Sequence, residues 1–534
     1  MSAAAPYRSP LPAGRDGFLQ LLHSEWTKFR TVRGWVVGTA VGAVMIVVMA
    51  ALTGGLSHSQ ICVATNGGPP TCHTAHQRIS TGPSGTPVTD QYELVHQPLQ
   101  GNGSITVRVT SLTGRYSPTG VVQAVSNGQT NLVRGVQPWS KAGVIITAGT
   151  TPGSPYAAAM VTGSQGVRMQ YDYIHDTAGP PGAVSLAAPR WLRLSRAGDT
   201  ITGYDSTDGS HWARIGTVRL AGLPATVQVG MFATSPDHIV TSQQFGGGSG
   251  NDSPSLATGT FDHVSVAGAA ASGGPWRGTP VGRSGMPGVG VHHTGDTFTL
   301  TGSGDIAPAV VGVGGSDPGQ GVERTLIGAF IGLIVLTVVA TLFITGEYRR
   351  GLIRSTFAAS PRRGRVLAAK ALVIAAVVFV AGLVAAGIAL PLGEHVLRGN
   401  GIAIYPAGTA TELRAIIGTA ALLSVAAVLA LAFATILRRS ALTVTAVIVL
   451  IVLPYILAVA SVLPAGPAEW LLRVTPAAAF AVQQTLVRYP QVAASYAPAD
   501  GYFPLAPWAG FAVLCGYAAC ALGLATYLVR RRDV

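Results

Sequence analysis

Charged residues are scarce in this chain of 534 residues, and lysine is the scarcest of them, with three copies. Asp, Glu, Lys and Arg together supply 11% of the residues, whereas 48% are hydrophobic. A soluble globular domain carries about 25% charged residues, so the composition excludes an ordinary soluble protein. We predict an integral membrane protein. The length and the Gly- and Ser-rich interior of the chain predict a second part outside the membrane.

The three lysines are Lys28, Lys141 and Lys370, and they follow Thr, Ser and Ala. A loop that cradles nucleotide phosphates needs Gly-Lys followed by Ser or Thr. None of the lysines has this setting. The chain is therefore not a standard ATPase, and we expect no cofactor in this chain itself.

Cysteine is also scarce, with four residues. Cys62 and Cys72 flank Gly-Gly-Pro-Pro, and outside the cytosol they would close a small disulfide-bonded loop. A metal site is the other interpretation, but His73 and His76 alone do not complete a ligand set. The remaining pair, Cys515 and Cys520, lies in the last apolar run and is interpreted as packing.

Six long apolar runs occupy residues 34–52, 325–346, 366–392, 413–437, 441–463 and 508–529. Each approaches the roughly 20 residues that cross a bilayer as a helix. Apart from Lys370, which we count to the polar connector before the third run, and Arg414, the second residue of the fourth run, these runs contain no charged residue, which disfavours a proton-coupled carrier. Pro454, in the middle of the fifth run, predicts a break or kink, either a moving element or a static bend.

An amphipathic helix is predicted before the first run, at residues 16–33, whereas residues 1–15 carry no functional signal. Its apolar face is formed by Phe18, Leu19, Leu22, Trp26 and Phe29. We expect the charged side chains Glu25, Lys28 and Arg30 to lie off this face. Such a helix suits the membrane interface, and packing on a soluble partner is the less favoured alternative.

Between residues 54 and 322, short strand-like runs alternate with Gly, Pro, Ser and Asn. The predicted strands include residues 104–109, 143–147, 166–173, 191–194, 200–204, 212–218 and 226–232. Asp208-Gly209 predicts a hairpin, because both residues tolerate positive φ. The pattern predicts an antiparallel all-β sandwich. Segments such as PLQGNGSITVRVTSL and WLRLSRAGDTITGYDSTDGSHWARIGTVRL resemble concanavalin-A/laminin-G-like jelly-roll modules, over about residues 93–266.

Aromatic and acidic side chains of the sandwich admit two interpretations. The aromatic residues that could stack on sugar rings are Trp139, Trp191, Trp212, Tyr171, Tyr173 and Tyr204, although alternating aromatics of strands are more often core. Asp199, Asp205 and Asp208 could supply oxygen ligands to calcium, but a turn already explains Asp208. Asp172 and Asp176 do not form a glycosidase pair, because nothing places a second carboxylate at the required spacing.

The connector GEYRRGLIRSTFAASPRRGRVLAAK, residues 346–370, holds seven basic side chains between the second and third runs. The two terminal segments, this connector and the 438–440 link contain 17 of the 35 basic but only 4 of the 22 acidic residues, and thus the whole net charge of +13. The positive-inside rule assigns them to the cytosol and the sandwich to the outside. Topology thus explains the basic runs, and no nucleic-acid partner is expected.

Three features together resemble the permease subunit of an ABC-2-type ABC exporter. They are the segment LLHSEWTKFRTVRGW before the first span, the six spans, and this connector. The resemblance covers about residues 16–56 and 322–534, and the large sandwich departs from it. It implies a separate ATPase that carries ATP, and a second permease copy, identical or not. It also implies an ATPase-coupling element with Glu347, Arg349, Arg350, Gly351 and Thr356, and an interfacial helix with Glu25, Trp26 and Lys28.

The expected architecture is therefore an α-helical polytopic membrane protein with an inserted jelly-roll sandwich, placed in the plasma membrane. Residues 1–33 form the cytosolic tail and interfacial helix, 34–53 the first span, 54–322 the extracytoplasmic insert, and 323–534 the other spans with the coupling loop 347–365. Two functions remain: an exporter permease, or a membrane-anchored sensor or adhesion protein that binds a glycan or envelope ligand. Basic connector side chains such as Arg362 and Arg363 suit either lipid phosphates or an acidic groove on a partner.

Overall fold

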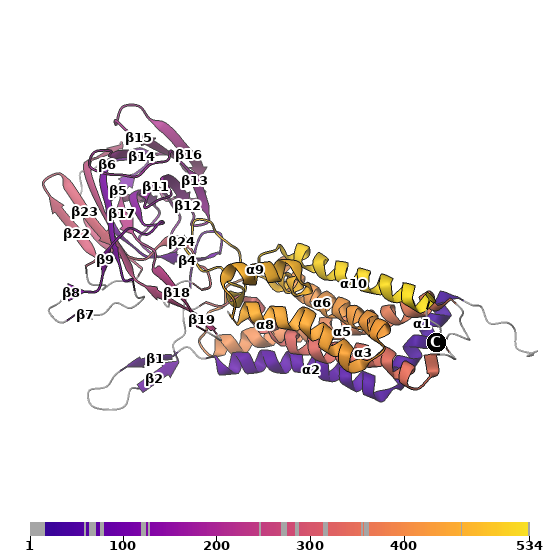
Figure 1. The fold of residues 1–534 in the computed structure, drawn as a ribbon. Coiled ribbons are helices and arrows are strands. Elements are labelled where there is room, and N and C mark those ends of the chain that lie inside the picture. The colour runs from indigo at the N-terminus through magenta and orange to yellow at the C-terminus, as the bar shows by residue number, and fades with distance from the viewer. Residues whose placement is uncertain are drawn as a thin grey trace, which may run out of the picture.

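The fold is that of a computed structural model, which describes residues 17–57, 60–63, 71–74, 79–118, 124–125, 129–244, 247–268, 275–282, 288–312, 319–353, 356, 362–460 and 462–531. A long helical bundle carries a β domain at one of its ends (Figure 1). Helix α1 and the C-terminal end of α10 lie at the opposite end of the bundle (Figure 1). The two ends of the bundle therefore differ in the elements that they carry.

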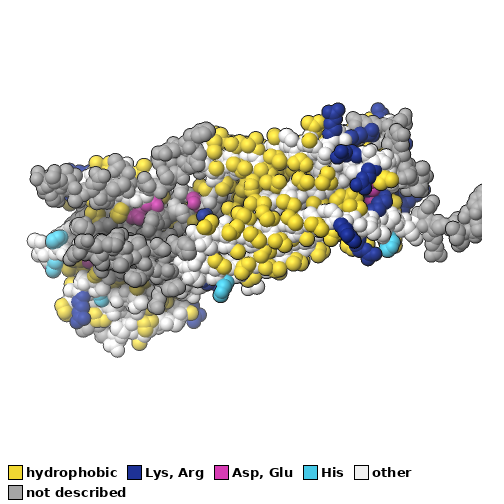
Figure 2. All heavy atoms as spheres, turned by 90° about the horizontal axis from the view of Figure 1, so that it is seen from below, with side chains coloured by type: hydrophobic (Ala, Val, Ile, Leu, Met, Phe, Trp, Pro, Cys, Tyr) yellow, Lys and Arg dark blue, Asp and Glu magenta, His cyan; other side chains and the backbone are white. Residues whose placement is uncertain are grey.

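Six helices among the described residues are long and apolar enough to span a membrane. They are α2 (Arg33–Leu56), α3 (Gly328–Arg349) with the preceding 3-10 turn η1 (Val322–Leu326), α5 (Arg363–Gly399), α6 (Thr409–Leu437), the composite of α7 (Ser440–Val447), a π-helical turn (Ile448–Val452) and α8 (Leu453–Val459), and α10 (Pro507–Arg531). Apolar side chains form a band over the face of the bundle seen in Figure 2, and Lys and Arg gather there at the end away from the β domain. The predicted fold class, six spans with an inserted all-β sandwich, is confirmed.

Glycines allow neighbouring spans to approach closely. A Cβ added to Gly328 of α3 would lie 2.4 Å from the backbone oxygen of Ile46 in α2, and one added to Gly332 would lie 2.4 Å from the Ile46 side chain. Gly382 of α5 is similarly close to Ala420 of α6, at 3.1 Å. Small residues at helix contacts let backbones pack at short range, which is how helices associate in lipid.

The β domain is a sandwich of two antiparallel sheets. The first has the order β13-β12-β11-β10-β17-β5-β21, and the second has the order β16-β15-β14-β6-β20-β23-β22 with β9 beside β6. The strands of the first sheet are β5 (Tyr92–Gln100), β10 (Lys141–Thr147), β11 (Tyr156–Thr162), β12 (Val167–Tyr171), β13 (His175–Ala178), β17 (Thr226–Thr234) and β21 (Arg277–Val281). Those of the second are β6 (Gly103–Tyr116), β9 (Val133–Arg134), β14 (Arg190–Ala197), β15 (Thr200–Ser206), β16 (Ala213–Arg219), β20 (Ser255–Gly268), β22 (Gly290–Thr294) and β23 (Thr297–Gly302).

Alternating apolar side chains fill the space between the sheets. Ile105, Val107 and Val109 of β6 are fully buried in one core cluster with Val144 and Ile146 of β10. Each of the seven predicted strand segments overlaps a strand of these sheets, although β12 covers only Val167–Tyr171 of the predicted 166–173. The sandwich continues past the predicted limit at residue 266, because β21 extends the first sheet and β22 with β23 extends the second.

The hairpin predicted at Asp208-Gly209 joins β15 to β16. Gly209 has φ of +79°, and the carboxylate of Asp208 accepts hydrogen bonds from the backbone N–H groups of Ser210 and His211, both at 2.8 Å. The loop is longer than a two-residue turn, since β15 ends at Ser206 and β16 begins at Ala213. Asp208 is thus engaged in turn formation.

Three described sheets have two strands each: β1 (Gln60–Val63) with β2 (Thr71–Thr74), β7 (Ala124–Val125) with β8 (Gln129–Thr130), and β18 (His238–Gln244) with β19 (Gly247–Ser253). The register of the first pair sets Cys62 opposite Cys72. The side chains of both cysteines lie outside the part of the chain that the structure describes, so their disulfide stays a prediction.

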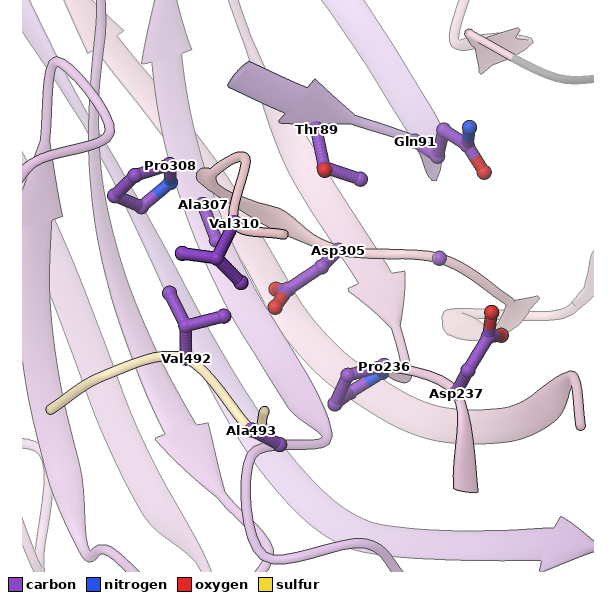
Figure 3. A pocket seen from close by; sticks show the side chains of 11 residues that line it. Thr89, Gln91, Pro236, Asp237, Asp305, Ala307, Pro308, Val310, Val492 and Ala493 are labelled. Atoms are coloured by element: carbon purple, nitrogen blue, oxygen red, sulfur yellow. The ribbon is translucent and has the colours of Figure 1, made fainter. Parts of the chain in front are cut away.

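A further small sheet, with the order β24-β4-β3, lies where the β domain meets the bundle. Its strands are β3 (Ser80–Thr81), β4 (Pro87–Asp90) and β24 (Ile306–Pro308). Val310, just after β24, packs with Val492 from the segment between α9 (Ala465–Val474) and α10 in one apolar cluster. Their side chains lie beside each other at the edge of a small cavity (Figure 3). The β domain therefore rests on the segment that joins the last two spans.

Candidate functional site

Two acidic and two basic side chains meet at the end of the bundle away from the β domain. Glu25 and Lys28 come from α1 (Phe18–Thr31), Glu347 from the last turn of α3, and Lys370 from α5. The Nζ of Lys370 lies 2.5 Å from Oε2 of Glu25 and 2.7 Å from Oε1 of Glu347. We call these four residues the charged cluster.

Lys28 completes the charged cluster from its open side. Its Nζ lies 2.7 Å from Oε1 of Glu25 and 3.3 Å from Oε1 of Glu347. It also lies 3.4 Å from the Oγ1 of Thr356 in the connector. Burial alone would lower the pKa of Lys28, but its hydrogen bond to Glu25 and the charges of Glu25 and Glu347 outweigh that effect and raise the pKa.

The charged cluster is largely excluded from water. Glu25, Lys370 and Glu347 are 0%, 1% and 4% exposed, while the side chain of Lys28 is 36% exposed. Among the described residues, Oε2 of Glu347 is buried without a hydrogen-bond partner. Breaking such a buried ion pair from one side costs about 3–5 kcal/mol, because the remaining charge stays desolvated. The cluster therefore holds α1, α3 and α5 in one arrangement.

Aromatic rings cover the charged cluster on the membrane side. The ring of Phe343 lies 4.8 Å from Nζ of Lys370 and contacts the rings of Phe29 and Trp35 edge-on, at 5.7 and 5.0 Å. A ring face attracts a nearby ammonium group, and more strongly where water is absent. The contacts among these rings thus help to pack α1 against the first two spans.

The inner face of α1 differs from the one expected from its spacing. Glu25 and Phe29 are its buried residues, while Leu19 is 75% and Trp26 is 43% exposed. The expectation that Glu25 lies off the packed face is wrong, because two ammonium groups compensate its charge there. Leu19 and Trp26 are left on the outer side, which suits a helix at a membrane interface.

The expectation that the spans carry no charge is wrong at Lys370, and Arg414 near the start of α6 is a second charged residue within the predicted runs. Lys370, counted to the connector from the sequence, belongs to α5 and is buried inside the bundle. A single cation inside an apolar helix needs a partner of opposite charge. The presence of Lys370 within an apolar run was therefore the feature of the sequence that could have indicated a buried ion pair. The charged cluster could not be assembled without it.

The described connector residues next to the charged cluster in the chain are mostly polar or glycine. Arg349 and Arg350 are exposed, and Gly351 follows the end of α3 with φ of +67°, a conformation that favours glycine. The guanidinium of Arg365, at the start of α5, lies 5.9 Å from the ring of Phe18 in α1. The Arg354 position and the Ser360-Pro361 pair lie outside the described residues. The two exposed arginines are thus available to another molecule at this end.

A second feature lies at the other end of the bundle, near Pro454. A π-helical turn, Ile448–Val452, precedes α8, and Pro454 is buried in the first turn of α8. The next residue, Tyr455, packs its ring against Phe480 at 4.1 Å and lines a hollow of about 300 Å³. Glu323, Gln483 and Asp500 line the same hollow. The irregular fifth span thus borders a polar hollow at the end that carries the β domain.

The sandwich residues that were candidates for ligand contacts are mostly engaged within the domain. Trp139 and Tyr173 are buried, whereas Trp191, Trp212, Tyr171 and Tyr204 are half-buried. Arg193 stacks over the Trp212 ring at 3.9 Å. Asp205 pairs with Arg190 at 3.0 Å, and Asp176 pairs with Arg168.

Comparison with known proteins adds two findings. A family model described as "ABC-2 family transporter protein" matches residues 166–534. Comparison with curated proteins finds no match.

Solved structures resemble the chain only weakly. They include a functionally unknown protein from Saccharomyces cerevisiae (13% identity, 40% of this chain and 93% of that chain, TM-score 0.23) and scytalido-glutamic peptidase (7%, 40% and 98%, 0.25). Lectin I-B4 from Griffonia simplicifolia also matches (10%, 42% and 92%, 0.19). Likeness at this level supports no inference about ligand or activity.

Proposed function

The chain belongs to the ABC-2 transporter family, and from this membership we propose that it is the permease subunit of an ATP-driven exporter. In this proposal the six spans form the membrane path. A separate ATPase subunit binds and hydrolyses ATP, and a second permease copy completes the path. The exposed connector end of the bundle is the surface on which the ATPase docks.

The charged cluster is the observation that carries the proposal. It joins α1, the end of α3, Thr356 of the connector and the start of α5 through short contacts between Lys370, Glu25 and Glu347. A movement imposed on the connector would therefore shift the second and third spans together with α1. The exposed Arg349 and Arg350 lie next to this joint and would contact the ATPase.

The distribution of charge supports a cytosolic location for this joint. Lys and Arg gather at the end of the bundle away from the β domain (Figure 2). Basic residues near span ends favour the cytosolic side. We therefore place both termini and the connector in the cytosol, and the β domain on the outer face of the cell membrane.

The proposal is tested by the paired substitution Arg349→Ala with Arg350→Ala. The tagged chain is purified from native membranes under mild conditions, and the associated ATPase and its transport-linked ATP turnover are measured. The wild-type chain brings down an ATPase. The variant retains at most about a tenth of the complex, which corresponds to ~1.4 kcal/mol.

Arg473→Ala is the control, because Arg473 is a half-buried arginine on α9 that pairs with Glu469 at 2.9 Å, outside the connector. It leaves the yield of ATPase unchanged. A wild-type chain that brings down no ATPase, or a connector variant with unchanged turnover, contradicts the proposal.

A glycan or envelope ligand of the β domain is a second candidate function. The half-buried Trp191, Trp212 and Tyr204, with Arg193, lie on β14, β15 and the loop before β16, and aromatic faces suit sugar rings. Glycan-array binding by the whole chain in detergent tests it. Binding that survives Trp191→Ala with Trp212→Ala excludes this face.

A further inference from the structure

A hollow of about 420 Å³ opens on the side of the bundle at the end that carries the β domain. Its wall is made by the first turn of α6, the start of α10, and two stretches of the segment between α9 and α10, residues 484–488 and 503–506. It is separate from the charged cluster, and it shares the wall residue Phe503 with the hollow beside Pro454. Nothing in the export proposal uses it.

Two arginines give this hollow a positive charge. Arg414 of α6 donates a hydrogen bond to the carbonyl of Gln484, and Arg488 donates one to the carbonyl of Phe503 at 3.2 Å. Among the described residues no acidic side chain lines the hollow itself, and the carboxylate of Glu323 accepts a hydrogen bond from the wall residue Thr485. A guanidinium has five N–H donors, so each carbonyl orients its arginine while further donors remain. The Nε of Arg414 is buried and has no acceptor within the described part of the chain.

Two helix N-termini add to this positive potential. Thr411 lies in the first turn of α6, and Pro507 is the first residue of α10, and both line the hollow. The N-terminus of a helix carries a partial positive charge and favours anions. Glu412 in the first turn of α6 offsets part of this potential, but it does not line the hollow, so the two arginines remain as charged donors for a multiply bonded oxyanion.

The surroundings of the hollow are apolar. Phe503, Pro504 and Leu505 form part of its wall. Leu413 and Trp508, next to the wall on α6 and α10, are each 55% exposed. Tryptophan is enriched where a span meets the headgroup layer. A ligand that carries an anionic group at this depth and an apolar body beside it fits both features.

We propose that this hollow binds a phosphate group, and that an anionic phospholipid headgroup at the end of the bundle near the β domain supplies it. Arg414 and Arg488 hold the phosphate oxygens, and the acyl chains lie along the exposed side of α6 and α10. Free inorganic phosphate has the same binding chemistry, and the experiment separates the two sources. The proposal does not depend on the export function.

The test uses the full chain purified in detergent and stripped of lipid. Its melting temperature is followed while phosphatidylglycerol, phosphatidylcholine or inorganic phosphate is added, and retained lipid is counted by mass spectrometry. Phosphatidylglycerol stabilises the chain and is retained over phosphatidylcholine. Arg414→Gln with Arg488→Gln weakens this retention at least about tenfold, since it removes both charges but keeps amide donors for the two carbonyls.

Arg473→Gln is the control, because it removes a basic side chain of α9 that lies outside the hollow. It retains lipid as the wild type does. The single variant Arg488→Gln keeps the test valid should the double variant fail to fold, because Arg488 is exposed. Stabilisation by inorganic phosphate alone supports the phosphate site and excludes the lipid as its source. Equal retention of both lipids with no effect of phosphate, or unchanged retention in the variants, overturns the proposal.

Discussion

The ammonium group of Lys370 lies 2.5 Å from a carboxylate oxygen of Glu25, although 345 positions separate the two residues in the chain. Both side chains are buried, and Glu347 holds the same ammonium group from its other side at 2.7 Å. The pair ties the helix before the first span to the start of the third. Its removal should therefore affect both folding and coupling.

Replacing Lys370 with Met should strongly destabilise the bundle. The substitution leaves Glu25 and Glu347 buried with only the half-exposed Lys28 to balance them, at a cost of about 3–5 kcal/mol. Thermal unfolding in detergent measures the loss. Lys28→Met should cost clearly less, and Glu25→Gln should restore part of the stability of Lys370→Met. Equal unfolding temperatures for Lys370→Met and Lys28→Met would show that the buried contacts carry no special weight.

Lys141 should hold the small sheet β24-β4-β3 against the sandwich. Its Nζ lies 2.5 Å from Oδ1 of Asp305 and donates to the carbonyl of Ile306 at 2.8 Å, and both charged groups are buried. Lys141→Met should cost about 3–5 kcal/mol.

The matched comparison for Lys141 is Arg108→Met. Arg108 pairs with Asp262 at 2.6 Å, but the side chains are 30% and 19% exposed. We expect a cost of about 0–1 kcal/mol for this surface pair. Protease resistance of the β domain in the intact chain reports both variants. A larger loss for Arg108→Met than for Lys141→Met contradicts the assignment.

Asp90 should make the β domain less stable as the pH rises. Burial raises the pKa of Asp90 to about 6, against hydrogen bonds from Tyr173 and Gly153 that lower it. Between pH ~4 and ~6 the unfolded chain has lost this proton and the folded chain still holds it, so stability falls with rising pH. The fall is about 3 kcal/mol, and it is complete above pH ~6.

Asp90→Asn should remove this pH dependence, because the amide cannot ionise while its oxygen still accepts the hydrogen bond from Tyr173. The measurement is the unfolding temperature of the β domain between pH 4 and pH 7 for both chains. An identical slope in wild type and variant would assign the dependence to other groups.

Local patterns were sufficient for the six spans and for seven of the fifteen described strands of the sandwich. Runs of apolar residues predict spans because each helix must satisfy its own backbone in lipid, and alternation predicts strands because successive side chains face opposite sides. Neither pattern shows which residues from distant parts of the chain contact each other. The burial of Glu25 depends on Lys370, and β21 is part of the sandwich only through its pairing with β5.

The charged cluster shows where a local rule fails. Spacing alone assigns Glu25 to the polar side of α1, since a carboxylate is costly to bury. The contact with two ammonium groups reverses this preference, and the exposed Leu19 and Trp26 follow from it. The chain has three lysines, and in the structure each of them forms an ion pair with a carboxylate. A search for an acidic partner of each lysine would have been the way to anticipate the charged cluster.

The junction between Val310 and Val492 should control how the β domain is held on the bundle. Both side chains are in one apolar cluster with Ala307, and Gln491 donates a hydrogen bond to the carbonyl of Ile174 at 3.1 Å nearby. Val492→Asp places a charge in this contact, which no described basic group of the cluster balances. We expect the β domain to detach from the segment before α10 while its own fold persists. Limited proteolysis would then cut near residue 312 at least several-fold faster, whereas Val474→Asp, at an exposed valine of α9, should leave the rate unchanged. Equal cleavage rates in the two variants would mean that this contact does not hold the domain in place.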